Sequence, residues 1–236
     1  MAEVAVLTVL GVDGCPGGWI GALVTVDGRR RPRGVRWLLV PDAAGLVAAA
    51  AEAAVTAVDM PIGLPDVGPR GCDTAARALL GPRASSVFPA PVRAVLDAAD
   101  YPDACERSRA ACGRALSKQA WGIVPRIADL DARMTPALQD TILEAHPELA
   151  FVRLSGGWLE PKRTSTGAAQ RVAALARWLP AASDALATAP RPARRDDAAD
   201  ALVLAWVALR RVTGVAIVLP GVPERDARGL RMEIVS

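Results

Sequence analysis

The sequence predicts an α/β fold in which a mixed sheet, an antiparallel meander of three strands plus parallel strands, is flanked by helices. Residues 4–40 contain three apolar runs separated by turn signals, which is typical of a meander. A helical segment then precedes the apolar run 55–60, and a helix between two strands favours a parallel crossover. With 236 residues and 52% hydrophobic residues, the chain is expected to form one domain, 1–236, around a sizeable core.

The individual elements follow from the pattern of apolar residues and turn residues. The expected strands of the meander are 4–12, 19–26 and 35–40, and the Ala-rich segment 41–54 is expected to be a helix. The run VTAVDM, residues 55–60, reads as a short strand that Pro61 stops.

Residues 66–136 change character and are expected to be a helical insertion within the domain. This range is rich in Pro, Ala and Arg, with turn signals between helical pieces. A strand is expected at 140–145, and the sequence closes with helices and a late strand. The predicted helices are 73–80, 91–98, 102–116, 167–179 and 194–211, and the late strand is 215–220.

Composition narrows the class of protein. The net charge of +3 gives no general basic surface, although local patches that bind nucleic acid are compatible with it. No run reaches transmembrane length, and the N-terminal segment lacks the basic region of a signal peptide, so we expect a cytoplasmic protein without membrane contact. The four cysteines have neither CxxC nor zinc-site spacing.

Carboxylates recur at the ends of the expected strands and at the start of the last helix. Asp13 follows the first strand, and Asp59 interrupts an apolar strand. Asp197 and Asp200 share one face of the helix that begins near Asp196, a favoured N-cap residue type. Turn chemistry alone also explains Asp beside Gly. Taken together, Asp13, Asp59, Asp197 and Asp200 indicate catalytic ligands of Mg²⁺ or Mn²⁺, of the kind that hold two ions about 4 Å apart.

The only histidine of the chain lies in the segment EAHPE. On an extended strand, Glu144, His146 and Glu148 would share one face, which favours a catalytic role for Glu144 and His146, with the histidine as general acid or base. A histidine that is hydrogen-bonded in the core is the alternative, because Pro147 can end the strand.

Several cationic and hydroxyl side chains are candidates for binding phosphate. The proline-framed segment GPRASSVFPAPVR presents guanidinium and hydroxyl groups that suit phosphate oxygens, although ordinary surface ion pairs explain an Arg-rich loop equally well. Only two of the 28 cationic residues are lysines, and one precedes TSTG and a helix. The candidate substrate-binding residues are Arg83, Ser85, Ser86, Arg93, Lys118 and Lys162.

A series of segments resembles a known protein family. The order of the first elements and the closing DAADALVLA resemble the RNase H-like superfamily, especially its Holliday-junction resolvase branch. More closely, the chain is similar to domain-of-unknown-function family 429, whose members are predicted nucleases. The similarity covers about residues 8–210 and is carried by GVDGCPGGW, VDMPIGLP, CDTAARALLGPRASSVFPAPVR, LSKQAWGI, ILEAHPELAF, PKRTSTG and DDAADAL.

The resemblance implies an RNase H-like fold and a metal-dependent nuclease. Asp13, Asp59, Asp197 and Asp200 fall on the acidic quartet of the superfamily, with Asp59 where the resolvase branch usually has a longer Glu. The expected partner is a nucleic acid or a nucleotide, and relatives of the resolvase type often form homodimers. Two alternatives are a non-catalytic RNase H-fold protein that binds nucleic acid or nucleotide, and a nucleotide-binding enzyme of the actin and sugar-kinase type, although the chain lacks the duplicated core of that superfamily.

Overall fold

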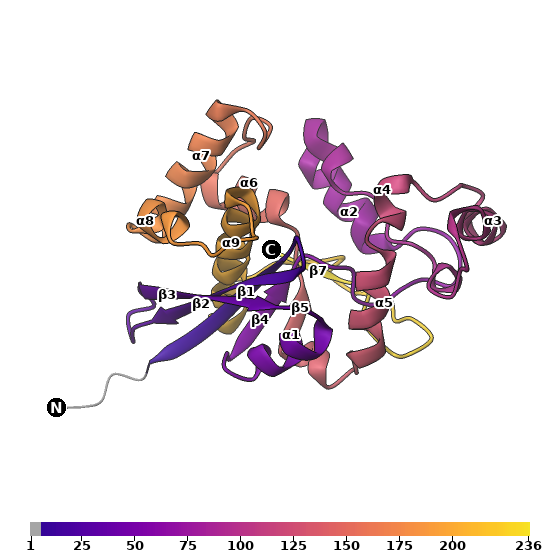
Figure 1. The fold of residues 1–236 in the computed structure, drawn as a ribbon, viewed down its shortest axis with the longest axis horizontal. Coiled ribbons are helices and arrows are strands. Elements are labelled where there is room, and N and C mark those ends of the chain that lie inside the picture. Colours follow the sequence, from indigo (N-terminus) through magenta and orange to yellow (C-terminus); the bar gives the residue numbers. More distant parts are fainter. Residues whose placement is uncertain (1–5) are drawn as a thin grey trace. The chain divides into compact units, whose positions relative to one another are not determined.

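The computed structural model describes residues 6–236 and has a five-stranded mixed sheet with the order β3-β2-β1-β4-β5 (Figure 1). The strands are β1 (Leu7–Cys15), β2 (Gly18–Val26), β3 (Pro32–Val40), β4 (Val55–Val58) and β5 (Ile142–Glu144). The first three form the antiparallel meander, and β4 and β5 run parallel to β1. The predicted α/β fold class, with a meander of three antiparallel strands plus parallel strands in one mixed sheet, is therefore confirmed, and this layout is consistent with an RNase H-like sheet.

The long helix α9 (Arg195–Val212) packs against β1, β2 and β4 (Figure 1). Its middle is buried over a continuous run from Ala198 to Ala205. The backbone of α9 approaches β1 at Gly11, where an added Cβ atom would lie 2.0 Å from the carbonyl oxygen of Ala201 and 2.1 Å from the nitrogen of Ala205. Only glycine permits this approach, which fixes the position of α9 on the sheet.

Three further helices surround α9 in the same part of the chain. Helices α6 (Pro147–Ser155) and α7 (Ser165–Ala176) pack on α9 and on each other, and α8 (Ala182–Ala187) packs on both α7 and α9. Thr164 caps α7, because its hydroxyl accepts a hydrogen bond from the Gly167 amide. The first part of the chain also contains the helix α1 (Ala43–Ala50).

The described chain separates into two compact units. The first comprises residues up to Asp59, Thr141–Ala216 and Val235–Ser236, and the second comprises Met60–Asp140 and Ile217–Ile234. The second unit contains the helices α2 (Gly71–Leu80), α3 (Tyr101–Cys112), α4 (Lys118–Trp121) and α5 (Val124–Arg133), with 3₁₀ turns η1 (Gly81–Ser86), η2 (Arg93–Val95) and η3 (Leu138–Asp140). The short strands β6 (Val218–Leu219) and β7 (Ile234–Val235) form a second sheet.

Two local predictions are wrong. The predicted helix 91–98 is reduced to the 3₁₀ turn Arg93–Val95. The extended conformation that would have placed Glu144, His146 and Glu148 on one face is absent: the strand ends at Glu144, and Pro147 occupies the first helical position of α6. Glu144, His146 and Glu148 therefore do not share the face of a strand.

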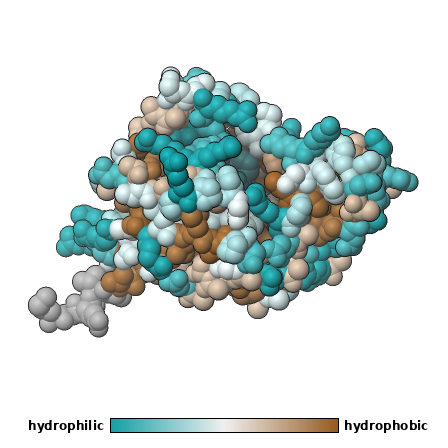
Figure 2. Space-filling model, in the orientation of Figure 1, coloured by the Kyte–Doolittle hydropathy of each residue, from teal (hydrophilic) through white to brown (hydrophobic). Residues whose placement is uncertain are grey.

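Hydrophilic side chains cover most of the face shown in Figure 2, with apolar side chains in smaller patches. Among residues 6–236, no helix is both long enough and apolar enough to cross a bilayer. The buried side chains of the sheet and α9, such as Leu10, Ile20 and Leu204, form the core of the first unit.

Candidate functional site

Asp13 and Asp59 lie next to each other on two parallel strands, Asp13 near the carboxyl end of β1 and Asp59 directly after β4. Val12 pairs with Val58 in the register of β1 and β4, and the Asp59 amide donates a 3.0 Å hydrogen bond to the Val12 carbonyl oxygen. Side chains alternate along a strand, so Asp13 lies on the same face as Gly11, the face that α9 covers. The predicted meeting of these two strand ends is therefore present in the structure.

The first turns of α9 bring Asp197 and Asp200 to the same site. The helix is capped at Arg194, not at Asp196: the Arg194 amide donates a 2.9 Å hydrogen bond to Oδ2 of Asp197. Asp197 thus stabilises the helix N-terminus, while Asp200 is buried one turn later. The interpretation of Asp196 as the N-cap is corrected, because the helix begins at Arg195 and Asp196 lies within its first turn.

Lys162 provides a positive charge within this cluster. Its Nζ atom donates a 2.7 Å hydrogen bond to Oδ2 of Asp200, and 39% of the Lys162 side chain remains exposed. The segment that carries Lys162 packs closely on α7 at Gly167, where an added Cβ atom would lie 2.1 Å from the Pro161 carbonyl oxygen. Close packing against α7 thus sets the position of the lysine.

The aspartates of the cluster have raised pKa values. Burial, followed by the nearby carboxylates of Asp59 and Asp200, holds the pKa of Asp13 well above its ordinary value. Burial likewise raises the pKa of Asp59 to about 7 and that of Asp200 to about 6, although Lys162 opposes both shifts. Burial also raises the pKa of Asp197. The single positive charge of Lys162 therefore does not offset the effect of burial on the four aspartates.

Glu148 acts on the charges of the cluster and is paired with Arg171, and neither residue was predicted as a site residue. The negative charge of Glu148 contributes to the raised pKa values of Asp59 and Asp200. Arg171 is almost fully buried, and its Nη2 atom lies 2.5 Å from Oε1 of Glu148. The Arg171 guanidinium also lies 5.3 Å from the ring centroid of Phe151. The sequence did contain a signal for the position of Glu148: Pro147, after the single histidine, is a residue type typical of the first position of a helix, and Glu148 lies on the helix that begins there.

Glu144 and His146 lie on different elements from those expected. Glu144 pairs with Val58 in the parallel register, so its side chain points to the opposite face of the sheet from Asp59. Its carboxylate is buried there. His146 is the N-cap of α6, and its Nδ1 atom accepts a 3.2 Å hydrogen bond from the Glu148 amide. The structure thus gives His146 a structural contact, and the predicted catalytic roles of both residues stay predictions.

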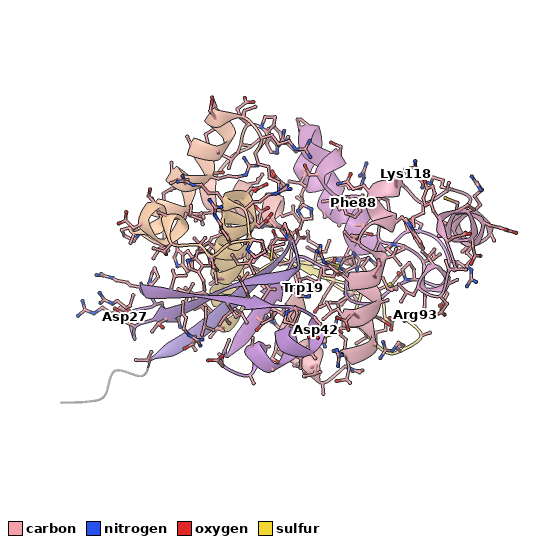
Figure 3. All side chains as sticks on the ribbon, in the orientation of Figure 1. Trp19, Asp27, Asp42, Phe88, Arg93 and Lys118 are labelled. Atoms are coloured by element: carbon pink, nitrogen blue, oxygen red, sulfur yellow. The ribbon has the colours of Figure 1, made fainter. Side chains whose placement is uncertain are left out.

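Most of the predicted phosphate ligands belong to the second compact unit. Arg93 donates hydrogen bonds to Asp131 at 2.8 Å and to Asp226 at 2.5 Å, so internal ion pairs engage its guanidinium. Lys118 is exposed at the start of α4 (Figure 3). The remaining three lie together in η1: Arg83, Ser85 and Ser86. Their roles as substrate-binding residues stay predictions.

The chemistry of the cluster suits a hard divalent cation. Its donors are carboxylate oxygens, the ligands that Mg²⁺ and Mn²⁺ prefer, and burial is the main cause of their raised pKa values. Across residues 6–236, however, no three side chains of Asp, Glu, His or Cys are already arranged to enclose a metal ion. The residue types therefore fit the predicted cofactor, and binding would require the side chains to adjust.

Comparison with known proteins gives one match. A family model described as "Protein of unknown function (DUF429)" matches residues 11–225, which is most of the chain and includes all four aspartates of the cluster. No curated protein and no solved structure matches the chain.

Proposed function

The chain belongs to the protein family of unknown function DUF429, and from the carboxylate cluster we propose that it is a metal-dependent phosphodiesterase that acts on nucleic acid. The observation that carries the proposal is the convergence of Asp13, Asp59 and Asp200 from β1, β4 and α9. Each of these carboxyl groups has a raised pKa with burial as the main cause. Residues that perturb one another in this way are typical of functional sites.

The residues have distinct proposed roles. Asp13 and Asp59 would hold one divalent ion, and Asp197 with Asp200 would hold a second. When bound, such ions would neutralise the carboxylates and stabilise negative charge on a phosphoryl group. Lys162 pairs with Asp200 and is partly exposed, and in this proposal its ammonium would bind a phosphate oxygen of the substrate. Arg171 would orient Glu148 beside this cluster.

Thermal unfolding with and without Mg²⁺ or Mn²⁺ tests the metal site. A cation that binds only the folded state raises its melting temperature, and we expect this rise in the parent protein. The rise should vanish in the double variant Asp13→Asn with Asp200→Asn. It should persist in Asp184→Asn, which removes an exposed carboxylate of α8. Equal shifts in all three proteins would contradict the proposed site.

Cleavage assays then test the activity. Branched, single-stranded and hybrid nucleic acids are offered to the parent and to the same variants with Mg²⁺ or Mn²⁺. We expect metal-dependent cleavage that the double variant loses and Asp184→Asn retains. A metal shift without cleavage of any substrate would contradict the activity and leave the cation site in place.

A second candidate is a non-catalytic protein that binds nucleic acid or nucleotide. The observation in its favour is the Lys162–Asp200 ion pair, which already supplies a cation to one of the carboxylates. In that case metal ions would not change the melting temperature, and oligonucleotides would bind equally well with EDTA. The predicted homodimer is testable in the same preparations by light scattering.

A further inference from the structure

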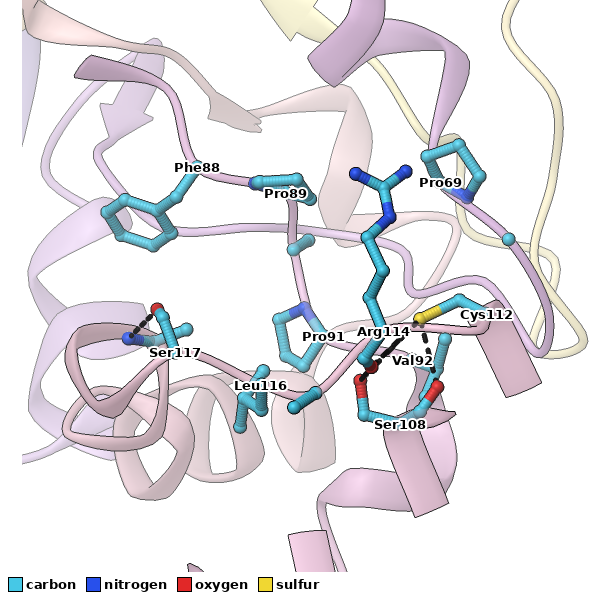
Figure 4. Close-up of a pocket in the computed structure, with 14 residues that line it drawn as sticks. Pro69, Phe88, Pro89, Pro91, Val92, Ser108, Cys112, Arg114, Leu116 and Ser117 are labelled. Carbon is cyan, nitrogen blue, oxygen red and sulfur yellow. Dashed lines mark hydrogen bonds between the residues drawn. The ribbon is translucent and has the colours of Figure 1, made fainter. Parts of the chain in front are cut away.

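The second compact unit contains a pocket that the proposed function does not use. It has a volume of about 250 Å³, and its walls include Pro69, Phe88, Pro89 and Pro91 (Figure 4). Phe88 is half-buried and packs against a buried apolar cluster, so its ring is held in place. Flat apolar side chains around a small concave space are suited to a planar ring.

Several hydrogen-bonding groups at the wall of this pocket, including the carbonyl oxygens of Arg114 and Leu116, are engaged within the protein. The Ser108 hydroxyl donates to the Arg114 carbonyl oxygen at 2.7 Å, and the Cys112 thiol lies beside the same oxygen. The Tyr101 hydroxyl donates to the Leu116 carbonyl oxygen at 2.8 Å. The prolines of the wall have no N–H group to offer. A ligand with many polar edges, such as a nucleobase, would therefore lose hydrogen bonds on entry.

The Arg114 side chain is the exception. Within the described part of the chain, its guanidinium has no hydrogen-bond or ion-pair partner, although its backbone carbonyl is engaged. Figure 4 shows the side chain extending among the prolines that line the pocket. A single guanidinium matches one carboxylate in charge and in its two-pronged geometry, and a phosphate dianion would require more positive charge.

We propose that this pocket binds a small aromatic monocarboxylate, with its ring against Phe88 and the prolines and its carboxylate on Arg114. The inference does not depend on the proposed phosphodiesterase activity, because every residue in it belongs to the second unit. The pocket thus assigns a ligand class to a region for which the sequence indicated only phosphate binding.

Calorimetric titration of the full chain tests the proposal with indole-3-carboxylate as the probe and indole-3-carboxamide as its neutral match. We expect the carboxylate to bind about tenfold more tightly than the amide, since the amide cannot form the charged hydrogen-bond pair with Arg114. Arg114→Gln should remove that difference. Arg109→Gln, an exposed arginine of α3 outside the pocket wall, should keep it.

Cysteine alkylation gives an independent measure of occupancy. Cys112 lines the pocket and is half-exposed, whereas Cys15, Cys72 and Cys105 are buried. The probe should slow alkylation of Cys112 in the parent and in Arg109→Gln, but not in Arg114→Gln. The proposal is overturned if the folded parent binds no carboxylate at millimolar concentration, or binds both probes equally. Tighter binding of adenosine monophosphate would also overturn the assigned ligand class.

Discussion

The ammonium nitrogen of Lys162 lies 2.7 Å from Oδ2 of Asp200, although the two residues are 38 positions apart in the sequence. The pair joins one of only two lysines of the chain to a carboxylate that is 3% exposed. Burial opposes the charge on Lys162, but the carboxylates of Asp200 and Asp13 outweigh it and raise the pKa of the lysine above its ordinary value. Lys162 therefore stays protonated across the physiological range.

Replacing Lys162 with Met should destabilise the metal-free protein at pH 8. The substitution leaves Asp200 buried without its partner, and a hydrogen bond to a charged group contributes about 1.5–3 kcal/mol, with the lower end expected because the lysine is partly exposed. Urea unfolding in EDTA measures the change. Lys118→Met, at an exposed lysine, is the matched control and should have no measurable effect. Equal stability of both variants would refute the role of the pair.

The stability of the metal-free protein should fall as the pH rises from 4 to 8. Asp59 and Asp200 have pKa values of about 7 and about 6 in the folded state, against 3.8 ordinarily, so the folded protein holds protons that the unfolded chain releases. The stabilising contribution of these protons is complete below about pH 4 and is lost as the pH passes through 6 and 7.

Urea unfolding at several pH values in EDTA measures this slope. The double variant Asp59→Asn with Asp200→Asn should have a flatter profile, because the two titrating groups are gone. Mg²⁺ should stabilise the parent more at pH 8 than at pH 5.5, since metal binding requires ionised carboxylates. A parent profile that coincides with that of the variant would show that the two groups do not titrate as described.

Replacing Gly11 with Ala should separate α9 from β1. The new methyl group would lie 2.0 Å from the Ala201 carbonyl oxygen, a backbone atom that no rotamer change can move. Overpacking of this kind costs about 1–3 kcal/mol or more, and it would also displace Asp200 from Asp13. Thermal unfolding and the Mg²⁺ shift are measured together. Gly34→Ala, which has no atom within 4 Å of the new Cβ, should leave both unchanged.

Replacing Arg171 with Met should lower the stability of the folded protein more than replacing both partners of its ion pair. The single variant leaves the Glu148 carboxylate without its buried partner, which costs about 3–5 kcal/mol. The double variant Arg171→Met with Glu148→Leu removes both charges and should regain part of the lost stability. Urea unfolding of the parent, Arg171→Met, Glu148→Leu and the double variant gives the complete double-mutant cycle. A double variant no more stable than Arg171→Met would contradict this account.

The sequence by itself determined the strand meander, the parallel fourth strand and the acidic residues at their ends. These features depend on local patterns: alternating or continuous apolar runs, turn residues between them, and charges inside apolar segments. Asp13, Asp59 and Asp200 could be identified because a carboxylate at the end of a buried strand or within a buried helix is costly, whatever surrounds it.

Only the tertiary structure decided which side chains meet. Glu144 faces away from Asp59 because of the pairing register between β4 and β5, and a shift of one residue would reverse that. The ion pair of Glu148 with Arg171 joins the helices α6 and α7, and the ion pair of Lys162 with Asp200 joins a loop to the helix α9. Such contacts depend on how closely backbones approach, as at Gly11 and Gly167, and no local pattern encodes that distance.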